Sequence, residues 1–81
     1  MTWRLTLYTR KECGLCEEMK AAVHSVARDI PLEIEEVDVD QSADLKERYG
    51  AEVPVLLING RKAFKYRATV KELKKKLRQT Q

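Results

Sequence analysis

Metal ligands and long apolar runs are both scarce in this sequence. It has one histidine and two cysteines, whereas a zinc site within one chain needs about four nitrogen or sulfur ligands. We therefore expect no bound metal, although a cluster shared between two chains and external thiols stays open. No run of about 18 apolar residues occurs, so no segment is expected to cross a membrane.

Signal-peptide features, repeats, linkers and low-complexity segments are also missing. The first residues lead directly into a strand-like pattern without the apolar core of a signal peptide. This favours a cytoplasmic location, where two cysteines are more often catalytic than cross-linking. The length of 81 residues predicts a single domain spanning 1–81.

Charges of opposite sign occupy different parts of the sequence. Between Asp29 and Asp40 every charged residue is acidic, whereas between Arg61 and Arg78 all except Glu72 are basic. A basic segment can attract nucleic acid or an acidic protein. No aromatic platform or reading motif accompanies these charges, so we interpret the segment as a solvated surface and expect no nucleic acid partner.

Hydrophobic periodicity predicts elements in the order β-α-β-α-β-β-α. Alternation at 3–8 is typical of a strand with two unlike faces, and apolar residues repeat at helical spacing at 15–26. The continuous apolar run at 55–58 indicates a strand covered on both faces. The expected strands cover 3–8, 32–39, 55–58 and 62–66, and the expected helices cover 13–28, 43–49 and a C-terminal segment from Thr69.

Short local signals set several of these boundaries. Ser42 and the two residues before it are candidate N-caps of the second helix, and Gly50 is its expected C′ residue. Asn59-Gly60 predicts a two-residue hairpin turn, because both residues tolerate positive φ. Thr69 begins a capping box that opens the last helix.

The order of elements predicts the fold class. A strand-helix-strand start gives a parallel pair through a right-handed crossover, and the hairpin adds an antiparallel strand. The apolar positions of the second strand change phase between Ile34 and Val37, which predicts a bulge or an early end there. We expect an α/β domain, a three-layer α/β/α sandwich with a mixed four-stranded sheet.

Both cysteines lie in the segment Cys13-Gly14-Leu15-Cys16, between the first strand and the first helix. This position places the first thiol over unpaired backbone N–H groups at the positive end of the helix. Reactive cysteines in such settings have pKa values of roughly 3.5–7.5, against about 8.5 for a free thiol. An inert pair that merely has this spacing is the alternative interpretation.

Residues 8–16, the Val53-Pro54 pair, the hairpin signal and the closing helix together resemble the thioredoxin fold in its small glutaredoxin form. The resemblance covers essentially the whole chain. It implies a thiol–disulfide oxidoreductase that acts on protein or small-molecule disulfides, with Cys13 as nucleophile and Cys16 as resolving thiol. Pro54 matches the cis-proline of the family, beside which the backbone of Val53 would pair with a substrate.

The resemblance also implies which residues contact the substrate. Arg10 matches the basic position three residues before the nucleophile in glutaredoxins, and would favour the thiolate or bind a carboxylate. Lys11 stands where glutaredoxins often have proline, and Gly14-Leu15 replaces their Pro-Tyr pair. The expected substrate-binding residues are therefore Arg10, Lys11, Gly14, Leu15, Val53 and Pro54.

The region after the hairpin departs from the glutaredoxin pattern. Glutaredoxins have a Gly-Gly pair there that holds glutathione, whereas 61–69 contains no glycine, and Glu52 replaces their threonine two residues before the proline. Glutathione is a candidate reductant, although the loop that binds it in glutaredoxins is absent here, so the thiol reductant is unassigned. We expect a monomer with no cofactor beyond the cysteine pair. The alternative function is a non-catalytic or redox-gated binding module that uses the basic C-terminal face.

Overall fold

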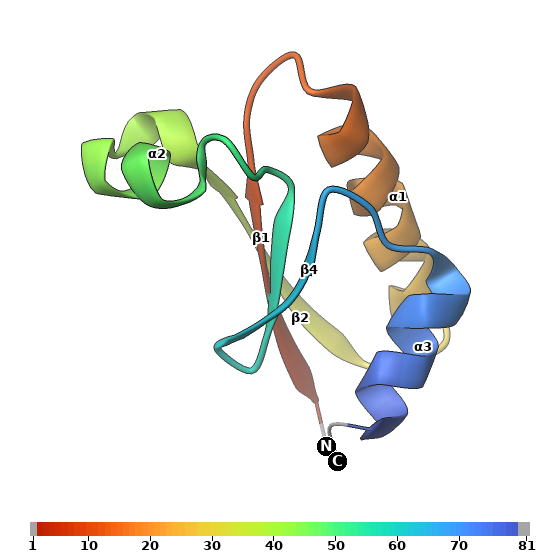
Figure 1. Cartoon of the computed structure of the whole chain (residues 1–81). Helices are drawn as coiled ribbons and strands as arrows, with labels where there is room; N and C mark the ends of the chain where they lie inside the picture. The colour runs from red at the N-terminus through yellow and green to blue at the C-terminus, as the bar shows by residue number, and fades with distance from the viewer. Residues whose placement is uncertain (1, 80–81) are drawn as a thin grey trace.

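A computed structural model describes residues 2–79 as a mixed four-stranded sheet with helices on both faces (Figure 1). The elements are β1 (Trp3–Thr9), α1 (Gly14–Ala27), β2 (Leu32–Asp38), the 3₁₀ turn η1 (Val39–Gln41), α2 (Ala43–Tyr49), β3 (Val55–Ile58), β4 (Arg61–Lys65) and α3 (Val70–Gln79). This order and the mixed sheet confirm the expected fold. Within 2–79, no helix has the length and apolar character needed to cross a membrane.

The sheet has the strand order β2-β1-β3-β4, so β1 and β3 are central and β2 and β4 are edge strands. β1 pairs in parallel with β2 and antiparallel with β3. The turn between β3 and β4 has positive φ at Asn59 (52°) and Gly60 (86°), as the sequence predicts. Because β1 and β3 run in opposite directions, the end of β1 and the start of β3 meet at one end of the sheet.

The core lies between the sheet and the helix pair α1 and α3. In β1, Leu5 and Leu7 point to this side, because alternate residues of a strand face the same way. They lie opposite Ile58 and Leu56 of β3, which are equally buried. The helices add their apolar stripes to this core: Met19, Val23 and Val26 from α1, and Leu73 and Leu77 from α3.

The opposite face of the sheet is covered only in part. In α2, no side chain is fully buried, and Tyr49 stacks on Tyr8 of β1 with ring centroids 4.4 Å apart. α2 therefore closes the end of the sheet that lies next to the start of α1 (Figure 1). Farther along the same face, Thr6 and Leu57 stay half-buried.

The prediction of a bulge or an early end in the second strand is wrong. β1 and β2 keep one register over all seven residues of β2. The change of phase needs no bulge, because Glu36 falls on the core side at the rim of the sheet and pairs with Lys20 of α1 at 3.2 Å. The register shift of this sheet lies instead between β3 and β4, at Leu56 and Leu57.

Gly50 ends α2 for a different reason from the one expected. Its φ of −55° and ψ of −34° are helical rather than left-handed, and its N–H donates to the carbonyl of Lys46 at 2.9 Å. A Cβ at this position would collide with the carbonyl oxygen of Lys46, so the chain needs glycine here for space. Ser42 caps the other end of α2 by accepting the N–H of Leu45 at 3.4 Å, as predicted.

Candidate functional site

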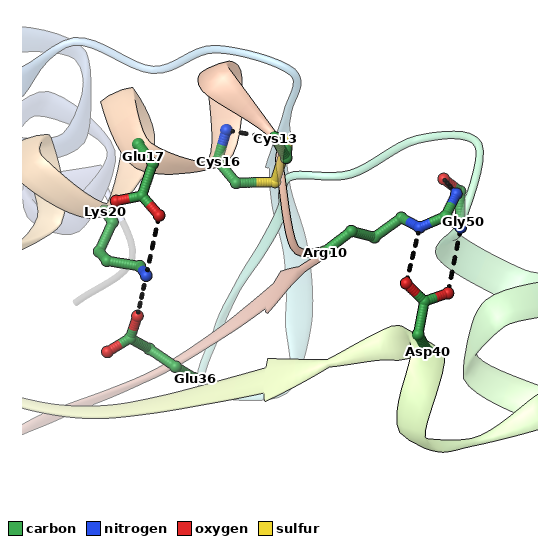
Figure 2. Close-up of a disulfide and its surroundings, with 8 residues drawn as sticks. All are labelled: Arg10, Cys13, Cys16, Glu17, Lys20, Glu36, Asp40 and Gly50. Atoms are coloured by element: carbon green, nitrogen blue, oxygen red, sulfur yellow. Dashed lines mark hydrogen bonds and ion pairs between the residues drawn. A yellow bond between two sulfur atoms is a disulfide. The ribbon is translucent and has the colours of Figure 1, made fainter.

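Cys13 and Cys16 form a disulfide at the N-terminal end of α1, with their Cα atoms 5.2 Å apart (Figure 2). Cys13 is the N-cap of the helix, and its sulfur accepts the N–H of Cys16 at 3.1 Å. Cys13 is half-buried, whereas Cys16 is only 1% exposed. A substrate sulfur can therefore reach Cys13, and the positive end of α1 favours a thiolate there.

The loop between β1 and α1 places Cys13 at the start of the helix. Glu12 adopts a positive φ of 55°, which turns the chain out of β1 just before the cysteine pair. Cys13 then has an extended backbone (φ −118°, ψ 105°), the conformation that an N-cap residue needs. Gly14 is the first residue of α1. The nucleophile expected from the sequence thus sits at the junction of loop and helix.

The Val53-Pro54 pair lies at the same end of the sheet. Its peptide bond is cis, as the resemblance implies. Val55, the first residue of β3, is opposite Tyr8 near the end of β1, and the carbonyl of Pro54 accepts the N–H of Tyr66 at 2.8 Å. Pro54 is buried and Val53 half-buried, and the role of this pair in substrate binding stays a prediction.

Arg10 points away from the disulfide (Figure 2). Its Nε lies 3.1 Å from Oδ2 of Asp40, its Nη2 lies 3.1 Å from Oδ1, and its Nη1 donates to the carbonyl of Gly50 at 3.4 Å. The guanidinium already binds a carboxylate of its own chain. The predicted contact between Arg10 and a substrate stays a prediction.

The other predicted contact residues near Cys13 are its sequence neighbours Lys11, Gly14 and Leu15. Lys11 and Gly14 are exposed and Leu15 is half-buried. Apart from its chain neighbours and the backbone of its own helix, no described atom lies within 4 Å of the point where a Cβ of Gly14 would stand, so a side chain would have room there. Their role in substrate binding stays a prediction.

A group of charges behind the disulfide was not found from the sequence. Lys20 lies one helical turn after Cys16, between Glu17 at 3.4 Å and Glu36 at 3.2 Å (Figure 2). The hydrogen bond from Lys20 to Glu36 raises the pKa of the Lys20 ammonium above its ordinary value. Glu36 also lies 3.9 Å from Nε2 of His24. The sequence signal that could have revealed this group was Glu36, because it is a carboxylate on the apolar side of β2.

By the resemblance described above, the loop between β4 and α3 corresponds to the part of glutaredoxins that binds glutathione. Tyr66 is 43% exposed and has a positive φ of 70°, although it is not glycine. At the start of α3, the N–H of Thr69 donates to Glu72 at 3.0 Å and the N–H of Glu72 donates to Thr69 at 3.1 Å. These two backbone donors are thus occupied by the predicted capping box.

Metal ligands do not gather in the part of the chain that the structure describes. Among residues 2–79, no group of three or more histidine, cysteine, aspartate and glutamate side chains is placed to hold a metal ion.

Comparison with known proteins places the chain in a family. Residues 4–78 match the family model described as glutaredoxin-like domain (DUF836). A structural genomics target protein from X. campestris is 33% identical, with a TM-score of 0.78 over 93% of this chain and 96% of that one. A protein from Nitrosomonas europaea is 26% identical, with a TM-score of 0.77 over 91% and 89% of the two chains.

Thioredoxins share the fold at lower identity. Mitochondrial thioredoxin 3 from Saccharomyces cerevisiae is 17% identical, with a TM-score of 0.70 over 95% of this chain and 77% of that one. Since a match at this identity shows the fold alone, it supports the architecture rather than a particular activity. The chain has the thioredoxin fold and belongs to the glutaredoxin-like (DUF836) family.

Proposed function

We propose that the protein is a thiol–disulfide oxidoreductase that uses Cys13 and Cys16 for dithiol exchange. The unequal burial of the two cysteines at a helix start is the observation that carries this proposal. Cys13 caps α1 and is accessible, whereas Cys16 is 1% exposed one turn further in. Membership of the glutaredoxin-like family supports a redox-type function.

The exchange cycle begins with the reduced pair. The Cys13 thiolate attacks one sulfur of a substrate disulfide, so that a Cys13–substrate disulfide forms and the other substrate sulfur leaves as a thiolate. The Cys16 thiolate then attacks the Cys13 sulfur. The Cys13–Cys16 disulfide forms, the remaining substrate thiolate leaves, and the released thiolates take protons from solvent. The protein loses two electrons, which an external thiol reductant restores.

The substrates in this proposal are proteins or small molecules that carry disulfides. A substrate sulfur approaches Cys13 beside Lys11, Gly14 and Leu15, and an extended substrate segment pairs with the backbone of Val53. No cofactor beyond the cysteine pair takes part. We place the cycle in the cytoplasm, where the thiol pools supply the reductant.

The order of attack is tested with single-turnover reactions of the fully reduced protein and an aromatic disulfide, 5,5′-dithiobis(2-nitrobenzoate). The natural protein is expected to release two equivalents of the coloured thiol and form its internal disulfide. Cys16→Ser should release one equivalent and remain as a mixed disulfide of matching mass. Cys13→Ser should lose the fast phase, and a fast phase that persists in this variant would contradict the proposal.

The reduction potential of the pair is the second test. It is measured by equilibrating the protein in thiol redox buffers and counting alkylated thiols. A value within the range of exchange proteins, roughly −120 to −270 mV, supports the cycle. A value far below about −300 mV, or no internal disulfide in solution, would mean that the pair does not cycle.

A further inference from the structure

A groove between α3 and the edge strand β4 lies outside the site described above. One hollow, of about 340 Å³, is lined by Ile58 of β3, by Arg61, Lys62 and Ala63 of β4 and by Lys76 and Gln79 of α3. A second, of about 240 Å³, is lined by Phe64 of β4 and by Glu72, Lys75, Lys76 and Gln79 of α3. The two hollows share Lys76 and Gln79 and are therefore neighbours, and together they are here called the β4–α3 groove.

The groove lies away from the cysteine pair. Its first hollow includes the start of β4, just after the hairpin turn, and the last residues of α3. Figure 1 shows the hairpin and the last turns of α3 at the end of the molecule opposite the start of α1. A partner bound in the groove would leave Cys13 accessible.

The charge of the groove is strongly positive. Arg61 and Lys75 are exposed, and neither has an ion-pair partner among residues 2–79. Glu72 is the one acidic residue among the described residues that line it, and its carboxylate is held by the N–H of Thr69 at 3.0 Å. The groove therefore favours an anionic occupant.

The backbone of β4 determines what kind of anion fits. β4 is an edge strand, so its outer N–H and C=O groups have no strand partner in the sheet. Residues 61–63 all line the first hollow, together with Ile58 of β3, so the hollow lies next to β4. An extended polypeptide can add a strand to such an edge, whereas bases of a nucleic acid need aromatic faces to stack on. Phe64, half-buried against the core, is the one aromatic side chain among the described residues that line the groove, whereas successive bases need a row of them.

We propose that the β4–α3 groove docks an extended, acidic segment of a partner protein. The segment adds a strand to β4 and places carboxylates against Arg61 and Lys75. The opposite edge strand, β2, carries Glu33 and Glu35 and would repel the same segment. Docking requires neither cysteine, so it can be tested apart from the exchange reaction.

The test is a titration of the ¹⁵N-labelled full chain with a blocked decapeptide of alternating glutamate and threonine. Amide shifts are expected at 61–65 and 75–79, and they should weaken as salt rises because the contacts are exposed. A decapeptide of alternating lysine and threonine should cause no shifts. Arg61→Gln/Lys75→Gln should weaken binding of the acidic peptide by about tenfold, since two exposed ion pairs are lost.

The matched control is Arg28→Gln/Lys46→Gln, which removes the same charge from exposed positions outside the groove. Its affinity should stay within about twofold of the natural chain. Thermal unfolding checks that both variants fold, and Lys75→Gln alone replaces the double variant if that one does not. Equal weakening in the control would overturn the proposal, because it would indicate general charge attraction.

Three further outcomes would also overturn it. Shifts centred on Cys13 would place the peptide at the cysteine site. Equal or tighter binding of a ten-nucleotide oligothymidylate to the same residues would assign the groove to nucleic acid. Self-association that Arg61→Gln/Lys75→Gln abolishes in sedimentation would assign it to the acidic β2 edge of a second copy.

Discussion

Arg10 and Asp40 form a two-pronged ion pair, with Nε 3.1 Å from Oδ2 and Nη2 3.1 Å from Oδ1. Arg10 belongs to the loop that precedes the cysteine pair, and Asp40 lies in η1. The same guanidinium reaches the carbonyl of Gly50 at the end of α2. One side chain thus joins the cysteine loop to both elements that follow β2.

Replacing Arg10 by lysine should cost about 1 kcal/mol of unfolding free energy, because lysine keeps the charge but cannot make the paired contacts. Arg48→Lys is the control, since Arg48 meets Asp44 at 3.5 Å and both side chains are about two-thirds exposed. Its cost should stay below about 0.5 kcal/mol. Urea unfolding measures both, and equal losses would show that the paired geometry does not matter.

Two glycine substitutions should change stability in opposite directions. Gly50→Ala should lose about 1–3 kcal/mol, because its Cβ collides with the carbonyl oxygen of Lys46. Gly14→Ala meets no atom within 4 Å at the first position of α1, and should gain about 0.4–1 kcal/mol by restricting the unfolded chain. Thermal unfolding followed by circular dichroism compares them. A stabilised Gly50→Ala would contradict the expected collision.

Glu52 should make stability depend on pH. Hydrogen bonds from Lys62, at 3.2 Å, and from Lys65 lower the pKa of the Glu52 carboxyl below its ordinary 4.5. The unfolded chain therefore binds this proton more readily, so the stabilisation is complete above about pH 4.5 and is lost as the pH falls through the lowered pKa.

The experiment compares urea unfolding of the natural protein and Glu52→Gln over a series of pH values. The natural protein should be the more stable near neutral pH, and the difference should shrink in acid. Glu47→Gln is the control, because Glu47 is exposed and has no ion pair among residues 2–79. A difference that stays constant into strong acid would exclude this role of Glu52.

Leu73 should be among the most costly residues to truncate. It is fully buried between α3 and the sheet, so Leu73→Ala is expected to lose about 2–5 kcal/mol of unfolding free energy. Leu57→Ala, on the half-buried opposite face, should lose less. Urea unfolding measures both variants, and equal losses would mean that the core is not concentrated on the side of α1 and α3.

Elements with strong local signals could be predicted from the sequence. The Asn59-Gly60 turn and the Thr69 capping box formed as expected, because both depend on interactions within a few residues. The course of β2 could not be predicted in the same way. Its regular register is set by pairing with β1, and the change of apolar phase reflects Glu36 meeting Lys20, which belongs to a different element.

The same distinction between local and long-range interactions applies to the candidate site. The placement of Cys13 at a helix start followed from its neighbours in the sequence. The direction of the Arg10 side chain did not, because its partner Asp40 lies thirty residues away. Long-range charge pairs leave no periodic pattern, so only the folded structure reveals them.

The strand order β2-β1-β3-β4 also bears on how fast the protein folds. α1 links β1 to β2 in the first half of the chain, and a two-residue turn links β3 to β4 in the second. Only pairs such as Leu5 with Ile58 join the sheet across these halves, and they close the longest loop. Loop closure of this kind slows folding. The pairing of β1 with β3 therefore limits the rate at which the two locally formed halves join into one domain.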